Sequence, residues 1–159
     1  MSLLPADERH LLRAIELAQL SRENGNHPFG ALLVDAVDTA VLEAENTVLT
    51  ENDSTNHAEL NLVRAASSRF DVPSLLACTL YTSTEPCAMC AGAIYWSGIG
   101  RVVYALSSEG LTVMVGDGDG DSELALPCRE VFGRGGRNVE VSGPHLEEEG
   151  RAVHEGFWG

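Results

Sequence analysis

Apolar residues recur at helical spacing near the start of the chain and then give way to two short apolar runs. An amphipathic helix is predicted over 7–22, where apolar residues stand three or four apart: Leu11, Leu12, Ile15 and Ala18. Gly25, Asn26 and Pro28 then end the helical pattern. The apolar runs at 29–35 and 40–44 are separated by a polar stretch, which predicts a β-hairpin.

Helical and strand patterns alternate through the middle of the chain. The predicted elements are a helix over 57–69, a strand over 77–81, a helix over 87–97 and a strand over 101–105. Thr55 or Asn56 could cap the first of these helices, and Pro86 suits the first turn of the second. This alternation predicts an α/β fold with helices packed on a sheet.

The pattern is weaker in the last third of the chain. Glycine-rich segments at 116–121 and 133–136 are predicted loops, 139–141 a short strand and 145–158 a last helix. With 159 residues and 17.0 kDa, the chain is long enough to bury a substantial core. We therefore expect one domain over 1–159.

Two short motifs supply residue types that bind zinc. His57-Ala58-Glu59 is followed, after a predicted helix and strand, by Pro86-Cys87-Ala88-Met89-Cys90. His57, Cys87 and Cys90 offer three ligands, and three protein ligands with an open fourth position are typical of a catalytic zinc site. Glu59 is two residues from His57, so on one helix their side chains point in different directions and we do not expect both to bind one ion.

Other uses of the cysteines fit less well. A thioredoxin-like redox pair is disfavoured because a His-x-Glu motif lies upstream and the flanking residues differ. Disulfides among the four cysteines are not needed by a chain of this size and apolar content. A structural zinc site closed by another Cys or His is an alternative, although such sites usually pair two close-spaced couples of ligands. Hydrolytic zinc chemistry is the favoured interpretation.

The motif spacing also suits that chemistry. Cys87 and Cys90 are three residues apart at a predicted helix start, so both sulfurs project from one face at the positive end of the helix dipole. That end lowers the pKa of a thiol, and neutral His57 would complete the set. Zinc lowers the pKa of a bound water from about 15.7 towards 7, and Glu59 would accept and return the proton.

The net charge of the chain indicates which class of molecule it binds. The chain has 24 acidic residues against ten basic ones, all arginine, and a formal net charge of −14. Proteins that bind nucleic acids neutralise the phosphates with Lys and Arg, so we do not expect this chain to bind a nucleic acid. We expect a small uncharged substrate instead. No apolar run is long enough to span a membrane and no secretory signal is visible, so we expect a cytoplasmic location.

The same motifs resemble those of the cytidine-deaminase-like superfamily of zinc-dependent nucleobase and nucleoside deaminases. The likeness covers about Pro28 to Ala105, where Asn46 and the segments 28–34 and 80–96 add to the metal motifs. It is strongest to the guanine deaminase and tRNA adenosine deaminase branches. It implies a three-layer α/β/α sandwich with a five-stranded mixed sheet, a zinc ion, and a homodimer with the pocket near an interface.

The resemblance also implies which residues hold the base: Phe29, Asn46, Ala58, Trp96, Phe157 and Trp158. Phe29 would stack on the ring, Asn46 would hydrogen-bond the base, and the Ala58 N–H would meet its carbonyl. Trp96 and the two C-terminal aromatic residues would close the pocket. The aromatic residues could instead be core or anchoring residues, and Asn46 could serve a turn.

The chain departs from the guanine deaminase pattern after the last strand of the motif region. Guanine deaminases carry an acidic residue there, and the loop with Asp117, Asp119 and Asp121 is the segment expected to supply it. This loop also matches the first positions of an EF-hand, but Ser122 and Cys128 stand where glycine and the bidentate glutamate are needed. Calcium binding is therefore not expected.

Together these patterns predict an enzyme. We expect zinc-dependent hydrolytic deamination of a free nucleobase or nucleoside, with guanine or a related aminopurine as the favoured substrate and ammonia as a product. Zinc-activated water would attack the ring carbon that bears the amino group, with Glu59 as the proton shuttle. The alternatives are a tRNA-specific adenosine deaminase, a cytosine or cytidine deaminase, and a catalytically silent metal-binding module.

Overall fold

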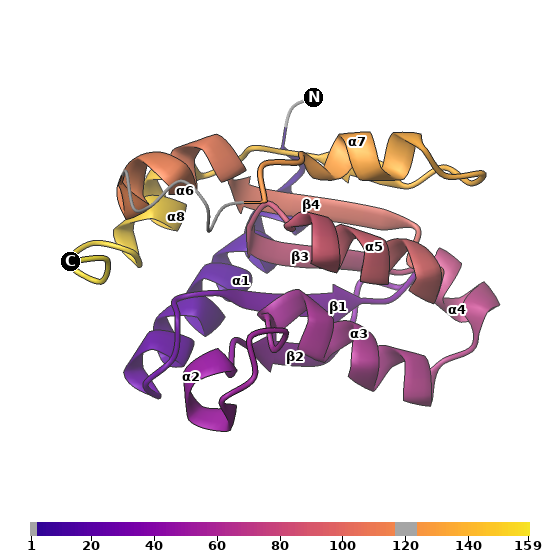
Figure 1. Cartoon of the computed structure of the whole chain (residues 1–159). Helices are drawn as coiled ribbons and strands as arrows, with labels where there is room; N and C mark the ends of the chain where they lie inside the picture. The colour runs from indigo at the N-terminus through magenta and orange to yellow at the C-terminus, as the bar shows by residue number, and fades with distance from the viewer. Residues whose placement is uncertain (1–2, 117–123) are drawn as a thin grey trace.

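A mixed β-sheet lies at the centre of the computed structural model, which describes residues 3–116 and 124–159 (Figure 1). Its five strands lie in the order β2-β1-β3-β4-β5. β1 pairs antiparallel with β2 and β3, whereas β3, β4 and β5 run parallel. The strands are β1 (Gly30–Val34), β2 (Ala40–Glu45), β3 (Thr79–Thr84), β4 (Arg101–Leu106) and β5 (Glu140–Ser142).

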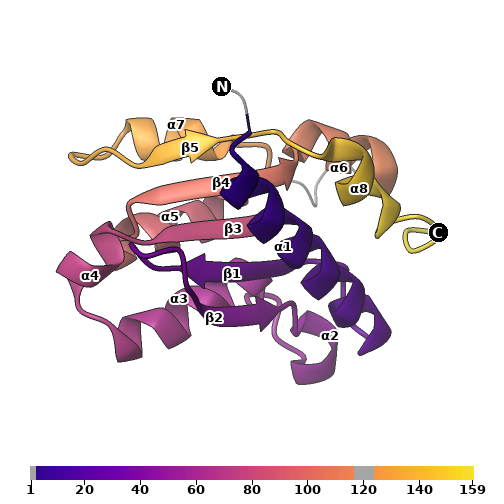
Figure 2. The ribbon, with the colours of Figure 1, turned by 180° about the vertical axis from the view of Figure 1, so that it is seen from behind.

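Helices cover both faces of this sheet. α3 and α5 lie on one face with α7 beside α5, and α1 crosses the other face, where α8 also lies (Figures 1 and 2). The helices are α1 (Pro5–Glu23), α2 (Val48–Glu51), α3 (Ala58–Arg69), α4 (Val72–Leu76), α5 (Ala88–Ser97), α6 (Ser108–Val115), α7 (Cys128–Gly133) and α8 (Glu147–Ala152). The predicted three-layer α/β/α sandwich with a five-stranded mixed sheet is confirmed.

Alternation along the strands gives the sheet one apolar core on each face. Leu33 and Val102 pack against α3 and α5, whereas Leu32 and Val103 pack against α1. α1 approaches β1 closely because Gly30 has no side chain. A Cβ at Gly30 would lie 2.5 Å from the Ala18 backbone nitrogen.

Most of the predicted elements are present within a few residues. The N-terminal helix, the hairpin, the helix over 57–69 and the strand, helix and strand between 77 and 105 are confirmed, and β5 matches the predicted short strand. The short helices α2, α4, α6 and α7 were not predicted, because helices of four to eight residues are too short to establish a periodic pattern. The loop predicted over 116–121 lies mostly outside the described residues.

Three details of the prediction were wrong. Neither Thr55 nor Asn56 caps α3, since the chain enters the helix at His57. Pro86 precedes α5 by two residues instead of lying in its first turn. The last helix ends at Ala152, and turns follow to a left-handed Gly156, a backbone that glycine adopts at little cost. None of the described helices has the length and apolarity to span a membrane.

Candidate metal centre

The starts of α3 and α5 lie together and join the two sequence motifs. His57 is the N-cap residue of α3 and Cys87 is the N-cap residue of α5, and both have extended backbones. Neither side chain caps its own helix, so both are free to turn toward each other. Cys90, one turn into α5, is fully buried and completes the cluster.

The spacing of these three side chains fits a tetrahedral zinc ion. His57 Nδ1 lies 3.5 Å from Cys87 Sγ and 3.6 Å from Cys90 Sγ. Zinc with bonds of about 2.05 Å to nitrogen and about 2.3 Å to sulfur needs about 3.6 Å between those atoms. No fourth His, Cys, Asp or Glu joins the group within the described part of the chain. The donor set therefore fits an open site better than a closed structural one.

The two thiols of this cluster have opposite pKa shifts. The hydrogen bond with Cys90, with help from His57, lowers the pKa of the Cys87 thiol to about 4 against the effect of burial. The hydrogen bond with Cys87 and burial both raise the pKa of the Cys90 thiol. The hydrogen bond with Cys87 raises the pKa of His57. One thiolate, the form that binds metals, is thus favoured near neutral pH.

Glu59 lies beside this cluster but does not belong to the ligand group. It is the second residue of α3 and only 5% exposed. Its Oε1 lies 2.9 Å from Thr82 Oγ1, and its Oε2 lies 3.8 Å from Cys90 Sγ. Burial is the main cause that raises the pKa of this carboxyl group. A buried carboxyl group with a raised pKa can hold a proton and release it again.

A cavity of about 660 Å³ opens beside His57 and Cys87. Its other walls come from α6 and from residues 124–127. Glu85 fixes these walls, because its carboxylate accepts hydrogen bonds from the backbone N–H groups of Ser108 (3.2 Å) and Cys128 (3.1 Å). The cavity therefore joins the metal cluster to segments far from it in the sequence.

Glu109 is a residue of this cavity that the sequence analysis missed. It lies on α6, three residues after β4, and lines the cavity together with His57 and Cys87. Its position after the last strand of the motif region was the signal that could have found it. The loop with Asp117, Asp119 and Asp121, expected to supply such an acid, lies outside the described residues.

The C-terminal aromatic residues pack near the start of β1. The Trp158 ring lies 6.3 Å from Phe29, 5.5 Å from His27 and 4.7 Å from Phe157, centroid to centroid. Trp158 Nε1 donates a hydrogen bond of 3.0 Å to Nδ1 of His154. Burial, followed by the charge of His57, lowers the pKa of His27.

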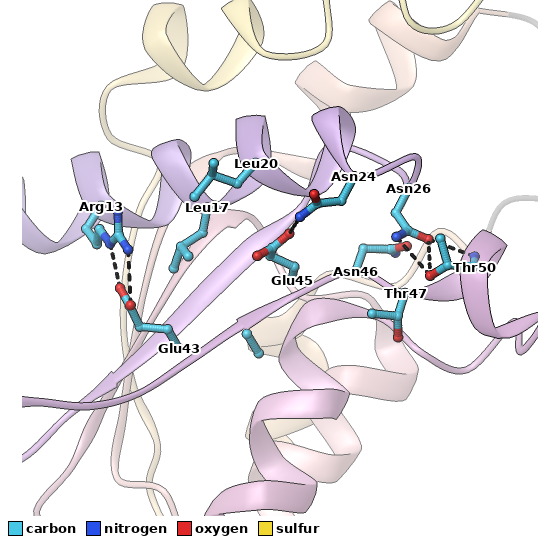
Figure 3. Close-up of a pocket in the computed structure, with 11 residues that line it drawn as sticks. Arg13, Leu17, Leu20, Asn24, Asn26, Glu43, Glu45, Asn46, Thr47 and Thr50 are labelled. Atoms are coloured by element: carbon cyan, nitrogen blue, oxygen red, sulfur yellow. Dashed lines mark hydrogen bonds and ion pairs between the residues drawn. The ribbon is translucent and has the colours of Figure 1, made fainter.

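Asn46 and Ala58 are both buried. Asn46 lines a groove between α1 and β2, beside the hydrogen-bonded pair Asn26 and Thr50 (Figure 3). Its Oδ1 accepts a hydrogen bond of 3.0 Å from the Val48 N–H, so the turn role considered from the sequence is present. The Ala58 N–H lies in the first turn of α3, where N–H groups lack intrahelical partners.

Trp96 is not brought to the metal cluster. It lies near the end of α5, nine residues beyond Cys87, which corresponds to about 13 Å along the helix axis. Its side chain is 84% exposed and contacts the ring of Tyr95 edge to face. Within one chain, therefore, Trp96 does not close the cavity.

Comparison with known proteins gives several relatives. A probable cytosine deaminase of Schizosaccharomyces pombe is 41% identical over 96% of this chain and 92% of its own length. A guanine deaminase of Bacillus subtilis is 45% identical over 62% of this chain and 63% of its own length. A tRNA-specific adenosine deaminase of Haemophilus influenzae is 40% identical over 64% and 58%. The chain thus spans under two thirds of the latter two proteins.

The fold and the metal motif agree with these relatives. The solved structure of a guanine deaminase from Nitrosomonas europaea has the same fold, with a TM-score of 0.76 over 97% of this chain and 84% of that one at 24% identity. The model of the cytidine and deoxycytidylate deaminase zinc-binding region matches residues 4–106, which include both motifs. The chain therefore belongs to the zinc-dependent cytidine and deoxycytidylate deaminase family.

Proposed function

We propose that this deaminase acts on a free nucleobase and that guanine is its favoured substrate. The observation that carries the proposal is the cavity itself, which is lined by His57 and Cys87 of the metal cluster and by Glu109. The cavity volume of about 660 Å³ is in the range of small-molecule sites. Buried Glu59 beside the cluster supplies a group for proton transfer.

In this proposal His57, Cys87 and Cys90 hold the zinc ion, which when bound supplies a Lewis acid that makes water acidic near neutral pH. Glu59 takes a proton from the attacking water and delivers it to a ring nitrogen. The new carbon–oxygen bond forms at the carbon that bears the amino group. Glu59 then carries the proton of the new hydroxyl group to that amino group, the carbon–nitrogen bond breaks, the carbonyl of the product forms, and ammonia leaves.

In this proposal, groups outside the lining of that cavity also hold the base. Phe29 and Trp158 offer aromatic faces for stacking, and Phe157 packs behind Trp158. The amide nitrogen of Asn46 has no hydrogen-bond partner recorded among the described residues, and the Ala58 N–H is a first-turn donor. Guanine also carries an N–H and an amino group side by side, and the Glu109 carboxylate can accept from both.

A panel assay tests this proposal. Zinc-loaded protein is incubated with guanine, guanosine, adenine, cytosine, cytidine and an adenosine-containing tRNA stem-loop, and ammonia is measured. We expect guanine to give the highest kcat/KM and the Glu59→Gln variant to be inactive on every substrate while it keeps its zinc. Absence of ammonia across the panel, or full turnover by Glu59→Gln, would contradict the proposal.

Cytosine is the second candidate substrate. The relative that matches 96% of the chain is named a probable cytosine deaminase. The aromatic cluster around Trp158 suits a pyrimidine as well as a purine, because every base has a face that can stack. A higher kcat/KM for cytosine than for guanine in the same panel would reverse the order.

Deamination of tRNA is less favoured. The net charge of −14 would repel a polyanion, and the described cavity contains Glu85 and Glu109 but no arginine. Inosine formation in the tRNA stem-loop, weakening steeply as salt is raised, would establish that activity instead. A cytoplasmic location stays a prediction from the sequence.

We also propose a homodimer formed through the outer face of α5. α5 contains no charged residue, Trp96 is 84% exposed, and a Cβ at Gly92 would meet open space. Surface helices ordinarily present a polar outer face. Two copies of a chain with a charge of −14 repel each other, so an uncharged face is the place where they can meet. Met89, on the same helix, lines the cavity, so the partner would lie at its border.

A further inference from the structure

We propose that Thr82 is a positioning residue that holds the carboxylate of Glu59 in its working orientation. Its hydroxyl binds Oε1 of Glu59 and thereby leaves Oε2 on the side of Cys90 and the metal cluster. This inference rests on the proposed role of Glu59 in proton transfer. It adds a residue outside both metal motifs that acts through Glu59 and need not touch the substrate.

Thr82 is rigidly placed by the sheet. It lies in β3, where it pairs with Ala31 of β1 on one side and with Tyr104 of β4 on the other. Its side chain faces the same side as Leu80, which packs in the core under α3 and α5, and it is fully buried. A hydroxyl on a central strand held by two neighbours offers a fixed anchor for a side chain on α3.

The hydrogen bonds of this hydroxyl suit both protonation forms of Glu59. Thr82 Oγ1 lies 2.9 Å from Glu59 Oε1 and 2.9 Å from the backbone oxygen of Thr84. A threonine hydroxyl has one hydrogen, and a carbonyl oxygen can only accept. The hydroxyl can therefore donate to an ionised Glu59, or accept from a protonated Glu59 while it donates to Thr84. Only the hydroxyl hydrogen needs to rotate between the two arrangements.

No other hydroxyl or amide side chain in the described part of the chain is recorded within hydrogen-bond distance of the Glu59 carboxylate. Its remaining side-chain contact is the weak sulfur contact of 3.8 Å with Cys90. Without Thr82 the carboxylate would keep its place on α3 and the hydrogen bond with its own backbone, but lose the bond that ties its Oε1 to the sheet. A small misplacement of a catalytic group costs up to about 100-fold in rate.

Three variants test this role. Thr82→Val keeps the shape of the side chain and removes the hydroxyl, whereas Thr82→Ser keeps the hydroxyl. Ser97→Ala removes a buried hydroxyl at the far end of α5, where it bonds the Ile94 carbonyl and the Ile99 N–H, and serves as the matched control. Each protein is measured for kcat and KM on the best substrate of the panel, for zinc per chain and for Tm. A crystal structure of Thr82→Val records the orientation of Glu59.

We expect Thr82→Val to lower kcat by about 10- to 100-fold with KM changed less than twofold and one zinc kept per chain. Glu59 should adopt more than one orientation in its crystal structure. Thr82→Ser should recover kcat to within about threefold, and Ser97→Ala should lower Tm but not kcat. Where valine impairs folding, Thr82→Ala compared with Thr82→Ser gives the same contrast.

The failures of the two proposals are distinguishable. Unchanged kcat in Thr82→Val, while Glu59→Gln is inactive, overturns the positioning role and leaves the function of Glu59 intact. Equal losses of kcat in Thr82→Val, Thr82→Ser and Ser97→Ala would mean that any loss of packing in this layer slows the enzyme. That result would also overturn the positioning role. Full turnover by Glu59→Gln overturns both proposals.

Discussion

Glu109 of α6 lines the same cavity as His57 and Cys87 of the metal cluster. Two adjacent donors on a base are matched by the two oxygens of a carboxylate, whereas a primary amide offers only one acceptor. Guanine presents such a donor pair beside the carbonyl that water does not attack. Cytosine has no pair of donors on adjacent ring positions. Substrate choice between these bases is therefore a property of one side chain in this proposal.

We predict that Glu109→Gln lowers kcat/KM for guanine by about 30-fold, since a hydrogen bond to a charged group contributes about 2 kcal/mol. The value for cytosine should change less than about threefold. Steady-state kinetics on both bases measure this, with Glu16→Gln on the exposed surface of α1 as the control. Equal losses on both bases would show that Glu109 supports the cavity instead of selecting its ligand.

At the scale of elements, the sequence predicted the helices and strands whose patterns depend on residues close together in the chain. The periodicity of 7–22 and the alternation between 57 and 105 established α1, α3, α5 and the central strands. His57, Cys87 and Cys90 could be grouped because each stands at the start of a helix that the sequence also predicts. Local patterns were therefore sufficient for the metal cluster.

What the sequence could not predict depends on contacts between distant segments. Thr82 and Glu59 are brought together only by the packing of α3 on β3, and Glu109 enters the cavity through the short helix α6. The predicted last helix was too long, because the turns after Ala152 are stabilised by packing of His154 and Trp158 against Phe29. Tertiary contacts of this kind override local helical preference.

The outer face of α5 leads to a prediction about the homodimer. We expect the protein to be a dimer and Trp96→Glu to be a monomer, because a buried unpaired charge at the centre of an interface is strongly unfavourable. Light scattering coupled to size-exclusion chromatography measures the mass of each. Val37→Glu, at a residue 79% exposed in the turn between β1 and β2, is the control and should stay dimeric. A monomeric wild-type protein would contradict the assignment.

At the scale of the whole molecule, the C-terminal segment is held to the sheet by groups sensitive to acid. His154 is 1% exposed and accepts the hydrogen bond of Trp158, and burial, followed by the charge of Arg22, lowers its pKa to about 4. Arg22 also donates to the backbone oxygens of Val153 and Glu155. Protonation of His154 would place a second cation beside Arg22 in a buried site.

Stability should therefore fall as the pH decreases. The unfolded chain binds the His154 proton below about pH 6.5, whereas the folded chain binds it only below about pH 4. This stabilisation is present above pH 6.5 and is lost progressively between those values, by about 2 kcal/mol from pH 7 to pH 5. Urea unfolding at both pH values measures the loss, which should be smaller in His154→Gln, whose amide still accepts from Trp158. An equal loss in both proteins would assign it to other groups, such as His27.

An ion bound by His57, Cys87 and Cys90 would also affect the stability of the folded chain. Its ligands come from two helix starts about thirty residues apart in the sequence, so an ion bound there ties α3 to α5. Closing a loop of that length removes unfolded-state entropy worth about 4 kcal/mol, as a disulfide of the same span does. Domains of this size are stable by about 5–15 kcal/mol in total. In a cell short of zinc the protein would then lose a large part of its stability, and the fraction open to unfolding and degradation would rise.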